Sequence, residues 1–270
     1  MEKSKEDINY ILELHALWLK GDISGERANL SFTDLSDEDL KGKNLSGASF
    51  YRSIIKDNDL SGCNFSGADM LCANLEGSDL YGANMTKANM YGANLSDASM
   101  VKVDLSGADL TESIIVDAKI TNSHLYKVTF RWSKLELSDL SSCDIDKSDF
   151  HFANLKGCNF SNSKMTFCDL RHATIDMAIF HNADLSESNF HFCSSVGANY
   201  FDANLSDTDF YKADLSESIF SHANMASVNF YGANIRNCSF IDASISNCTM
   251  DKVDLSGVDL NEAWMLTRKG

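Results

Sequence analysis

Basic and aromatic residues recur together at every twentieth position in the middle of the chain. We call this set the basic-aromatic strip. Tyrosine, tryptophan and arginine are the side chains most enriched at binding hot spots, so the strip predicts a docking surface for a protein or for an anionic partner. The alternative is that its rings and guanidinium planes only stabilise neighbouring turns of the chain, as cross-strand pairs do in a sheet. The strip consists of Arg131, Trp132, His151, Phe152, Arg171, His172, His191, Phe192, Tyr211 and Lys212.

The histidines of the strip do not predict a metal site. His151 and His191 lie two 20-residue intervals apart, which is about 10 Å if each interval adds one strand spacing. No carboxylate belongs to the strip, and arginines one interval away favour neutral imidazoles because like charge opposes protonation. We expect neither a metal nor a cofactor.

Seven aspartates form a second unusual set in the N-terminal half of the chain, called the acidic edge below. If they lie along one edge, roughly opposite the strip, they could imitate the phosphate row of a nucleic acid. The alternative is that aspartate and asparagine are simply the common outward residues of the repeat described below. The members of this set are Asp37, Asp39, Asp57, Asp59, Asp79, Asp97 and Asp117.

No recognisable catalytic motif occurs: the chain contains no P-loop, GxGxxG, GxSxG or HExxH sequence. We therefore expect no catalytic residues and no enzymatic activity. Seven of the eight cysteines share one repeat position with alanine, serine, valine and threonine, which indicates small buried side chains. Cys72 departs from that position and is expected to be a surface thiol.

Charge and hydropathy exclude several classes of partner. The net charge of −16 argues against binding a nucleic-acid backbone directly. No stretch approaches the roughly 18 apolar residues of a membrane span, and residues 1–20 lack the features of a secretory signal. We expect a cytoplasmic protein that contacts neither membrane nor nucleic acid.

A five-residue repeat organises residues 26–265 and must position all of these side chains. From Leu30 to Met265, the residue at each multiple of five, called the centre below, is Leu, Ile, Met, Phe or Tyr with a single exception. The position two before the centre holds Ala, Ser, Cys, Val or Thr in all except three pentapeptides. Twelve of the 15 glycines lie two positions after a centre, where a tight turn favours them. Each pentapeptide thus points one large and one small side chain inward and then turns.

The positions of phenylalanine predict how many turns close one coil. Eleven centres are phenylalanine, and all except Phe65 are at multiples of ten. A coil of four pentapeptides has four faces and places these ten rings on two opposite faces, whereas coils of three or five pentapeptides would mix them with the aliphatic centres. Stacked at the strand spacing of about 4.8 Å, such coils form a rod.

The stretch GANMTKANMYGANLSDASM, from Gly82 to Met100, resembles the A(D/N)LXX signature of the pentapeptide-repeat family. The resemblance implies an all-β fold, a right-handed quadrilateral parallel β-helix of about 12 coils. Members of the fluoroquinolone-resistance branch bind DNA gyrase by resembling duplex DNA, and their rods pair through C-terminal ends. By resemblance, the acidic edge could therefore bind gyrase, and the chain could be a monomer or an end-to-end homodimer.

The chain ends predict three regions: a helix and linker over residues 1–25, the repeat over 26–265 and a tail over 266–270. Ser4 and Asp7 form a capping-box pattern, and Gly21 stops the helix that we predict over residues 5–19. This helix would cap the first coil; binding a partner is the alternative, and His15 would be a boundary residue rather than a ligand. One helical face carries Ile8, Ile11, Leu12, His15, Trp18 and Leu19.

Two irregularities interrupt the repeat. Ser195 replaces an aliphatic centre, and we expect a local bulge there rather than a binding site. Glu38, Lys43 and Asn58 break the small-residue position in the first coils, which predicts a looser or polar interior near the helix.

These features favour a non-enzymatic scaffold that binds another protein through the basic-aromatic strip. A DNA-mimicking gyrase or topoisomerase binder that acts through the acidic edge is one alternative. A purely structural rod is the other.

Overall fold

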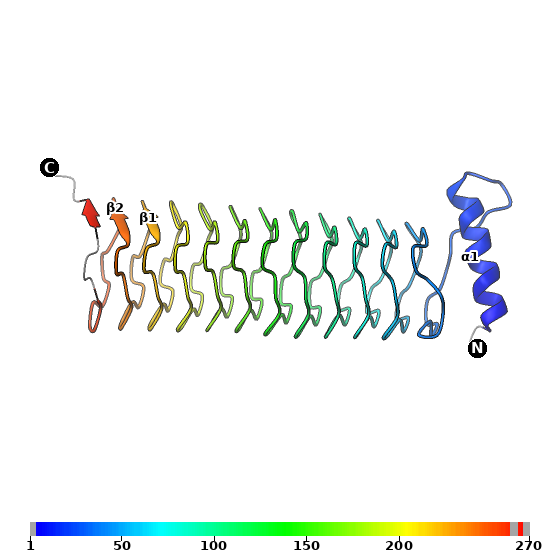
Figure 1. Cartoon of the computed structure of the whole chain (residues 1–270), viewed down its shortest axis with the longest axis horizontal. Helices are drawn as coiled ribbons and strands as arrows, with labels where there is room; N and C mark the ends of the chain where they lie inside the picture. Colours follow the sequence, from blue (N-terminus) through cyan, green and yellow to red (C-terminus); the bar gives the residue numbers. More distant parts are fainter. Residues whose placement is uncertain (1–3, 260–263, 267–270) are drawn as a thin grey trace.

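The computed structural model describes residues 4–259 and 264–266, which form a rod with a helix at one end (Figure 1). Helix α1 (Lys5–Leu19) lies at the N-terminal end of the rod. Strands β1 (Asn224–Ala226), β2 (Ser244–Ser246) and β3 (Trp264–Leu266) lie at the opposite end. None of the helices formed by the described residues is long and apolar enough to span a membrane.

Parallel backbone pairing joins residues that are 20 positions apart along the rod, so the predicted coil of four pentapeptides is confirmed. Isolated parallel bridges run from Asn29↔Ser49 to Ser239↔Asp259. At the C-terminal end β1, β2 and β3 pair in parallel in the order β1-β2-β3. The rod is thus a parallel β-helix in which most of the pairing consists of single bridges, because each face is too short for a long strand.

A left-handed backbone conformation ends each pentapeptide. From Phe32 to Gly257, every residue two positions after a centre has φ between 52° and 70°, with Asp37 as the exception. Glycine adopts this conformation without strain, and asparagine and aspartate tolerate it better than other residues. The predicted turn is therefore present in this left-handed form in all of these pentapeptides except the one at Asp37, and most of the turns use residues other than glycine.

The core of the rod consists of the centre residues and the small residues two positions before them. Every centre from Leu30 to Phe240 is essentially inaccessible to solvent. Phenylalanine rings stack along the rod, as Phe130 and Phe150 do at 4.9 Å, and meet edge to face across it, as Phe150 and Phe160 do at 6.2 Å. The phenylalanine pattern that predicted the coil length is therefore a packing pattern.

Helix α1 has the predicted bounds and lies against the first coils. Ser4 Oγ accepts a hydrogen bond from the Asp7 N–H, and Asp7 Oδ2 accepts one from the Ser4 N–H, so the capping box is formed. His15 is buried, and its Nδ1 accepts a hydrogen bond of 3.1 Å from the Ala28 N–H. Ile8 is buried on the same face. His15 is thus a boundary residue, as predicted.

Hydrogen bonds from a buried asparagine satisfy backbone carbonyls of the irregular first coils. Asp37 does not adopt the left-handed turn, and the Asn58 side chain is buried beneath that segment. Asn58 Nδ2 donates to the Leu35 carbonyl at 2.8 Å and to the Glu38 carbonyl at 2.9 Å. The predicted polar interior near the helix is therefore present at Asn58.

The expected bulge at Ser195 is wrong. Ser195 keeps the regular backbone pairing, with its N–H donating to the Asp214 carbonyl at 2.7 Å, and it is fully buried. Its Oγ lies 2.7 Å from the Tyr200 hydroxyl, which extends from the adjacent centre toward the missing aliphatic group. The Tyr200 ring itself stacks on Phe180 and Phe220, at 4.9 Å from each. A hydroxyl pair thus takes the place of an aliphatic side chain.

We predict that Ser195 and Tyr200 are energetically coupled. Tyr200→Phe leaves the Ser195 hydroxyl unpaired, and Ser195→Leu overpacks against the phenol, so each change alone should cost about 1–3 kcal/mol. The double variant restores the aliphatic and phenylalanine pair of other coils and should recover most of that loss. Urea unfolding of all four proteins measures the coupling; additive losses would contradict it.

We predict that α1 loosens in mild acid because His15 must remain neutral. Burial, and to a lesser extent the charge of Arg27, lower the pKa of His15 below 6.5. The unfolded chain therefore binds the proton more readily, so stability is complete above about pH 6.5 and falls as the pH drops below that value. Protonation also removes the acceptor of the Ala28 N–H, which should cost about 1–3 kcal/mol.

Hydrogen exchange of the Ala28 amide tests this prediction. Its protection factor should fall between pH 7.5 and pH 5, whereas His15→Asn, whose side chain can accept the same bond without titrating, should show little change. Equal pH dependence in both proteins would rule out His15 as the cause.

Candidate functional site

Four rings of the basic-aromatic strip form a continuous stack on one corner of the rod. Trp132 stacks on Phe152 at 4.0 Å, Phe152 on His172 at 4.8 Å, and His172 on Phe192 at 5.2 Å between ring centroids. The planes of each pair lie within 13° of parallel. This stack is called the ring ladder below.

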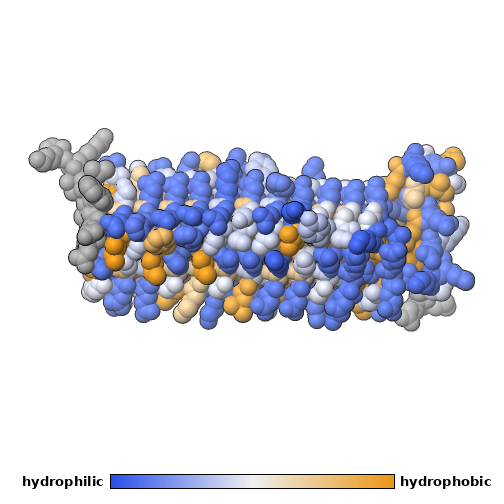
Figure 2. Space-filling view, in the orientation of Figure 1, coloured by the Kyte–Doolittle hydropathy of each residue, from blue (hydrophilic) through white to orange (hydrophobic). Residues whose placement is uncertain are grey.

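The ring ladder arises because each ring lies on the left-handed turn residue of its coil. Trp132, Phe152, His172 and Phe192 have φ between 57° and 60°, and each turn lies beside the same turn of the next coil. The side chains point away from the core, and Trp132, Phe152 and Phe192 are 56%, 38% and 46% exposed. The ladder is therefore an exposed and mostly apolar feature, whereas the face of the rod drawn in Figure 2 is largely hydrophilic.

Carboxylates pair with basic residues of the strip, which corrects the prediction that none lies there. Arg131 Nε lies 2.5 Å from Asp149 Oδ2. Arg171 contacts Asp169 through two of its nitrogens, and His191 Nε2 lies 2.6 Å from Asp209 Oδ2. These aspartates precede the centres of the adjoining face, and sequence spacing did not connect them to the strip. The strip is therefore more aromatic than basic.

The pairing perturbs the acid–base properties of the strip. Burial alone would raise the pKa of Asp169, but hydrogen bonds from Arg171 outweigh it and lower that pKa below its usual value. The pKa of His151 is lowered mainly by burial, while Arg171 adds to this effect and Asp169 opposes it. The predicted preference of His151 for the neutral form is thus confirmed, with burial rather than arginine as its main cause.

The strip continues beyond Phe192 toward the C-terminal end of the rod. Lys212 Nζ lies 5.6 Å from the Phe192 ring centroid and 5.1 Å from that of Tyr211. Tyr211 stacks on Tyr231 at 5.5 Å, and a shallow cavity of about 530 Å³ is lined by Tyr211, Asn229, Tyr231 and Thr249. Tyr231 is in the same column one coil after Tyr211 but is not among the predicted residues of the strip.

The acidic edge occupies two adjacent columns near α1, and all seven of its aspartates are exposed. Asp37, Asp57, Asp97 and Asp117 are at turn positions, and Asp39, Asp59 and Asp79 are on the face that follows. Because a coil has four corners, one in each pentapeptide, these turns form the corner next to the ring ladder. We expected the acidic edge to lie roughly opposite the strip, and this expectation is wrong. The edge lies beside the strip and nearer the N-terminus.

Lys41 partly neutralises the acidic edge. Its Nζ lies 2.7 Å from Asp59 Oδ2, and this hydrogen bond, together with those from Ser61, lowers the pKa of Asp59 to about 2. Asp59 therefore stays anionic even in mild acid. A cavity of about 320 Å³ lies among these residues and is lined by Asp37, Asp39, Asp57 and Asp59 together with Ser36, Glu38, Lys41 and Asn58.

The cysteines behave as small core residues. All eight are free, Cys72 is exposed, and buried thiols donate to backbone carbonyls, as Cys143 Sγ does to the Ile120 carbonyl at 2.8 Å. Burial raises the pKa of Cys63 to about 11 and that of Cys143 to about 12, so both stay protonated. Among the described residues, no group of three or more His, Cys, Asp or Glu side chains could hold a metal ion.

The comparison with known families identifies the repeat. A family model of pentapeptide repeats matches this chain in eight copies. No curated protein matches the chain. The matched residues are 26–57, 59–97, 88–125, 123–162, 163–194, 203–240 and 238–265.

Solved structures of two pentapeptide repeat proteins are similar to this chain. HetL, which is involved in heterocyst differentiation regulation in the cyanobacterium Nostoc sp. strain PCC 7120, is 22% identical over 94% of this chain and 95% of HetL, with a TM-score of 0.33. QnrB1, a plasmid-mediated fluoroquinolone resistance protein, is 20% identical over 80% of this chain and 88% of its own, also with a TM-score of 0.33.

Proposed function

The chain belongs to the pentapeptide-repeat family, and we propose that it is a non-enzymatic scaffold that binds another protein through the basic-aromatic strip. The ring ladder is the observation that supports this proposal most strongly. Its rings are exposed but held in fixed positions by stacking, so little conformational entropy is lost when a partner covers them.

The partner that suits this surface is a protein with an apolar patch rather than a polyanion. Asp149 and Asp169 already neutralise the guanidinium groups of Arg131 and Arg171. Apolar ring area without net positive charge favours a dehydrated protein contact. The rims of such a contact could still use Lys212, which forms no salt bridge within the described part of the chain.

The proposal includes the remaining architectural predictions. The rod would be right-handed, with about 12 coils, and α1 would cap the first coil and protect its backbone edge from other strands. The proposed regions are 1–25, 26–265 and 266–270, of which residues 1–3, 260–263 and 267–270 lie outside the described residues. The rod would act as a monomer or an end-to-end homodimer.

A cytoplasmic location is also part of the proposal. Eight free thiols in one chain, most of them buried in a core without any disulfide, suit a reducing compartment.

We predict that removing two rings abolishes partner capture without unfolding the rod. Trp132→Ala with Phe152→Ala deletes one end of the ring ladder, whose buried contact with a partner should be worth at least about 2 kcal/mol. In affinity capture with the immobilised protein, the amount of partner measured by mass spectrometry should fall at least tenfold. The midpoint temperature of thermal unfolding should change little.

Leu137→Ala with Met177→Ala is the matched control for this experiment. Both residues are at left-handed turns on the neighbouring corner, and each is 64% exposed. This control should capture the partner normally. If the ring variant keeps full capture and only loses thermal stability, the strip packs the coils together and the rod is structural.

The acidic edge supports a second candidate, a DNA-mimicking binder of DNA gyrase or another topoisomerase. Its exposed carboxylates run along two adjacent columns, and the resemblance to the fluoroquinolone-resistance branch motivates the target. Lys41 pairs with Asp59 and reduces the negative charge of the edge, so we place this candidate second.

We predict for this candidate that purified protein inhibits DNA supercoiling by gyrase at micromolar concentration. Asp57→Asn, Asp59→Asn and Asp79→Asn together should relieve inhibition at least tenfold, because three of the mimicking charges are lost. The control neutralises Asp202, Asp207 and Asp251, three exposed aspartates elsewhere on the rod, and should still inhibit. Absence of inhibition by the unchanged protein refutes this candidate.

A further inference from the structure

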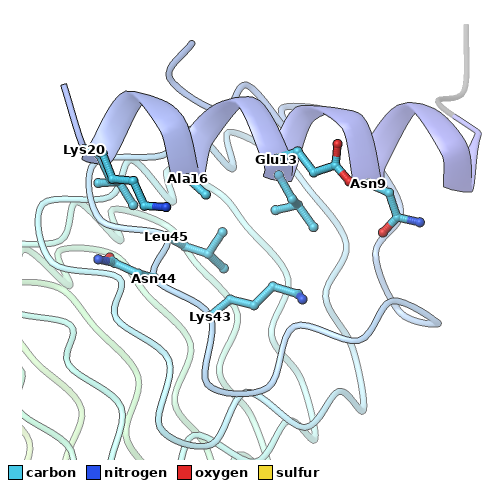
Figure 3. A pocket seen from close by; sticks show the side chains of 9 residues that line it. Asn9, Glu13, Ala16, Lys20, Lys43, Asn44 and Leu45 are labelled. Carbon is cyan, nitrogen blue, oxygen red and sulfur yellow. The ribbon is translucent and has the colours of Figure 1, made fainter. Parts of the chain in front are cut away.

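A mostly apolar groove separates α1 from the first coils, far from the basic-aromatic strip. It encloses about 740 Å³, a volume typical of small-molecule sites. Leu12, Ala16 and Leu19 line it from the helix, and Leu45 lines it from the coil. Figure 3 shows Ala16 and Leu45 on the two sides of the groove. Hydrophobic side chains are visible along this junction in Figure 2.

Lys43 gives the groove a charge that the repeat does not explain. It takes the position two before the centre Leu45, where nearly every other pentapeptide has a small residue. Its backbone is regular, with the N–H donating to the Leu40 carbonyl at 3.0 Å. The side chain lies in the groove facing α1 (Figure 3). No earlier coil covers this side of the rod, so a long side chain can be accommodated here.

The Lys43 ammonium is placed beside apolar groups without a salt-bridge partner within residues 4–259. Lys20 and Glu13 are the other charged residues that line the groove. These three side chains sum to a single positive charge, in a chain whose net charge is −16. An apolar site with one excess positive charge is complementary to a ligand with one negative charge and an apolar body.

We propose that this groove binds a medium-chain monocarboxylate, with the alkyl chain against the leucines and the carboxylate on Lys43. Glu13 disfavours ligands that carry two negative charges. The ligand contacts both α1 and the first coil, so its binding stabilises the docked helix by mass action. This site is independent of the proposed strip and would persist if the strip has no partner.

Calorimetric titration of the full chain with octanoate tests the proposal. Octanoate should bind the unchanged protein, and butanoate and octan-1-ol should each bind at least about tenfold more weakly, because one lacks apolar length and the other lacks charge. Lys43→Ala, which restores the small residue of the repeat, should weaken octanoate binding about tenfold or more. Lys43→Arg should retain most of the affinity.

Two further variants make the result specific. Lys134→Ala, which removes an exposed lysine from another face, should bind octanoate normally. Glu13→Gln should tighten octanoate binding, because it removes a like charge from the groove.

The proposal is overturned if octanoate does not bind, if Lys43→Ala binds it normally, or if octan-1-ol binds as well as octanoate, which would make the groove a plain apolar contact surface. If Lys43→Ala fails to fold, Lys43→Met makes the same test with a side chain of similar length.

Discussion

Backbone hydrogen bonds between successive coils are the constraint on which the rest of this structure depends. Most centre N–H groups donate to a carbonyl of the next coil, as Leu30 does to Ser49 at 2.7 Å, and the Ser49 N–H returns a bond of 2.9 Å to the Ala28 carbonyl. These bonds hold every coil at four pentapeptides. A single inserted residue would shift each later side chain out of its column, so the core and the surface share one register.

This register converts sequence intervals into surface features. Equivalent residues of successive coils become neighbours, and a ring that recurs at the turn position must stack on the ring of the next coil. The ring ladder is therefore a direct consequence of the register, with Trp132 and Phe152 only 4.0 Å apart. The same register places Asp149 beside Arg131 from the adjoining face. An aromatic surface without excess charge results, on a rod that is strongly acidic overall.

Departures from the repeat are accommodated in two different ways. In the interior, a second polar group compensates for the first, as the Tyr200 hydroxyl does for Ser195 and as Asn58 does for the carbonyls of the irregular first coil. At the N-terminal end no preceding coil covers the chain, so Lys43 extends into the groove beside α1 without such compensation. An uncompensated polar group beside an apolar surface is costly unless solvent or a ligand satisfies it.

The pentapeptide turn, the coil of four pentapeptides, the buried centres and the bounds of α1 could all be predicted from the sequence, because each depends on local periodicity or on a local capping pattern. The sequence also determined that Trp132, Phe152, His172 and Phe192 belong to one column. Contacts in the folded rod were needed to show that Asp149 and Asp169 neutralise the strip and that Tyr200 fills the space at Ser195. The position of the acidic edge on the neighbouring corner follows from the 20-residue coil and could have been derived from the sequence. The two contacts depend on the length and direction of individual side chains, which the period of the repeat does not specify.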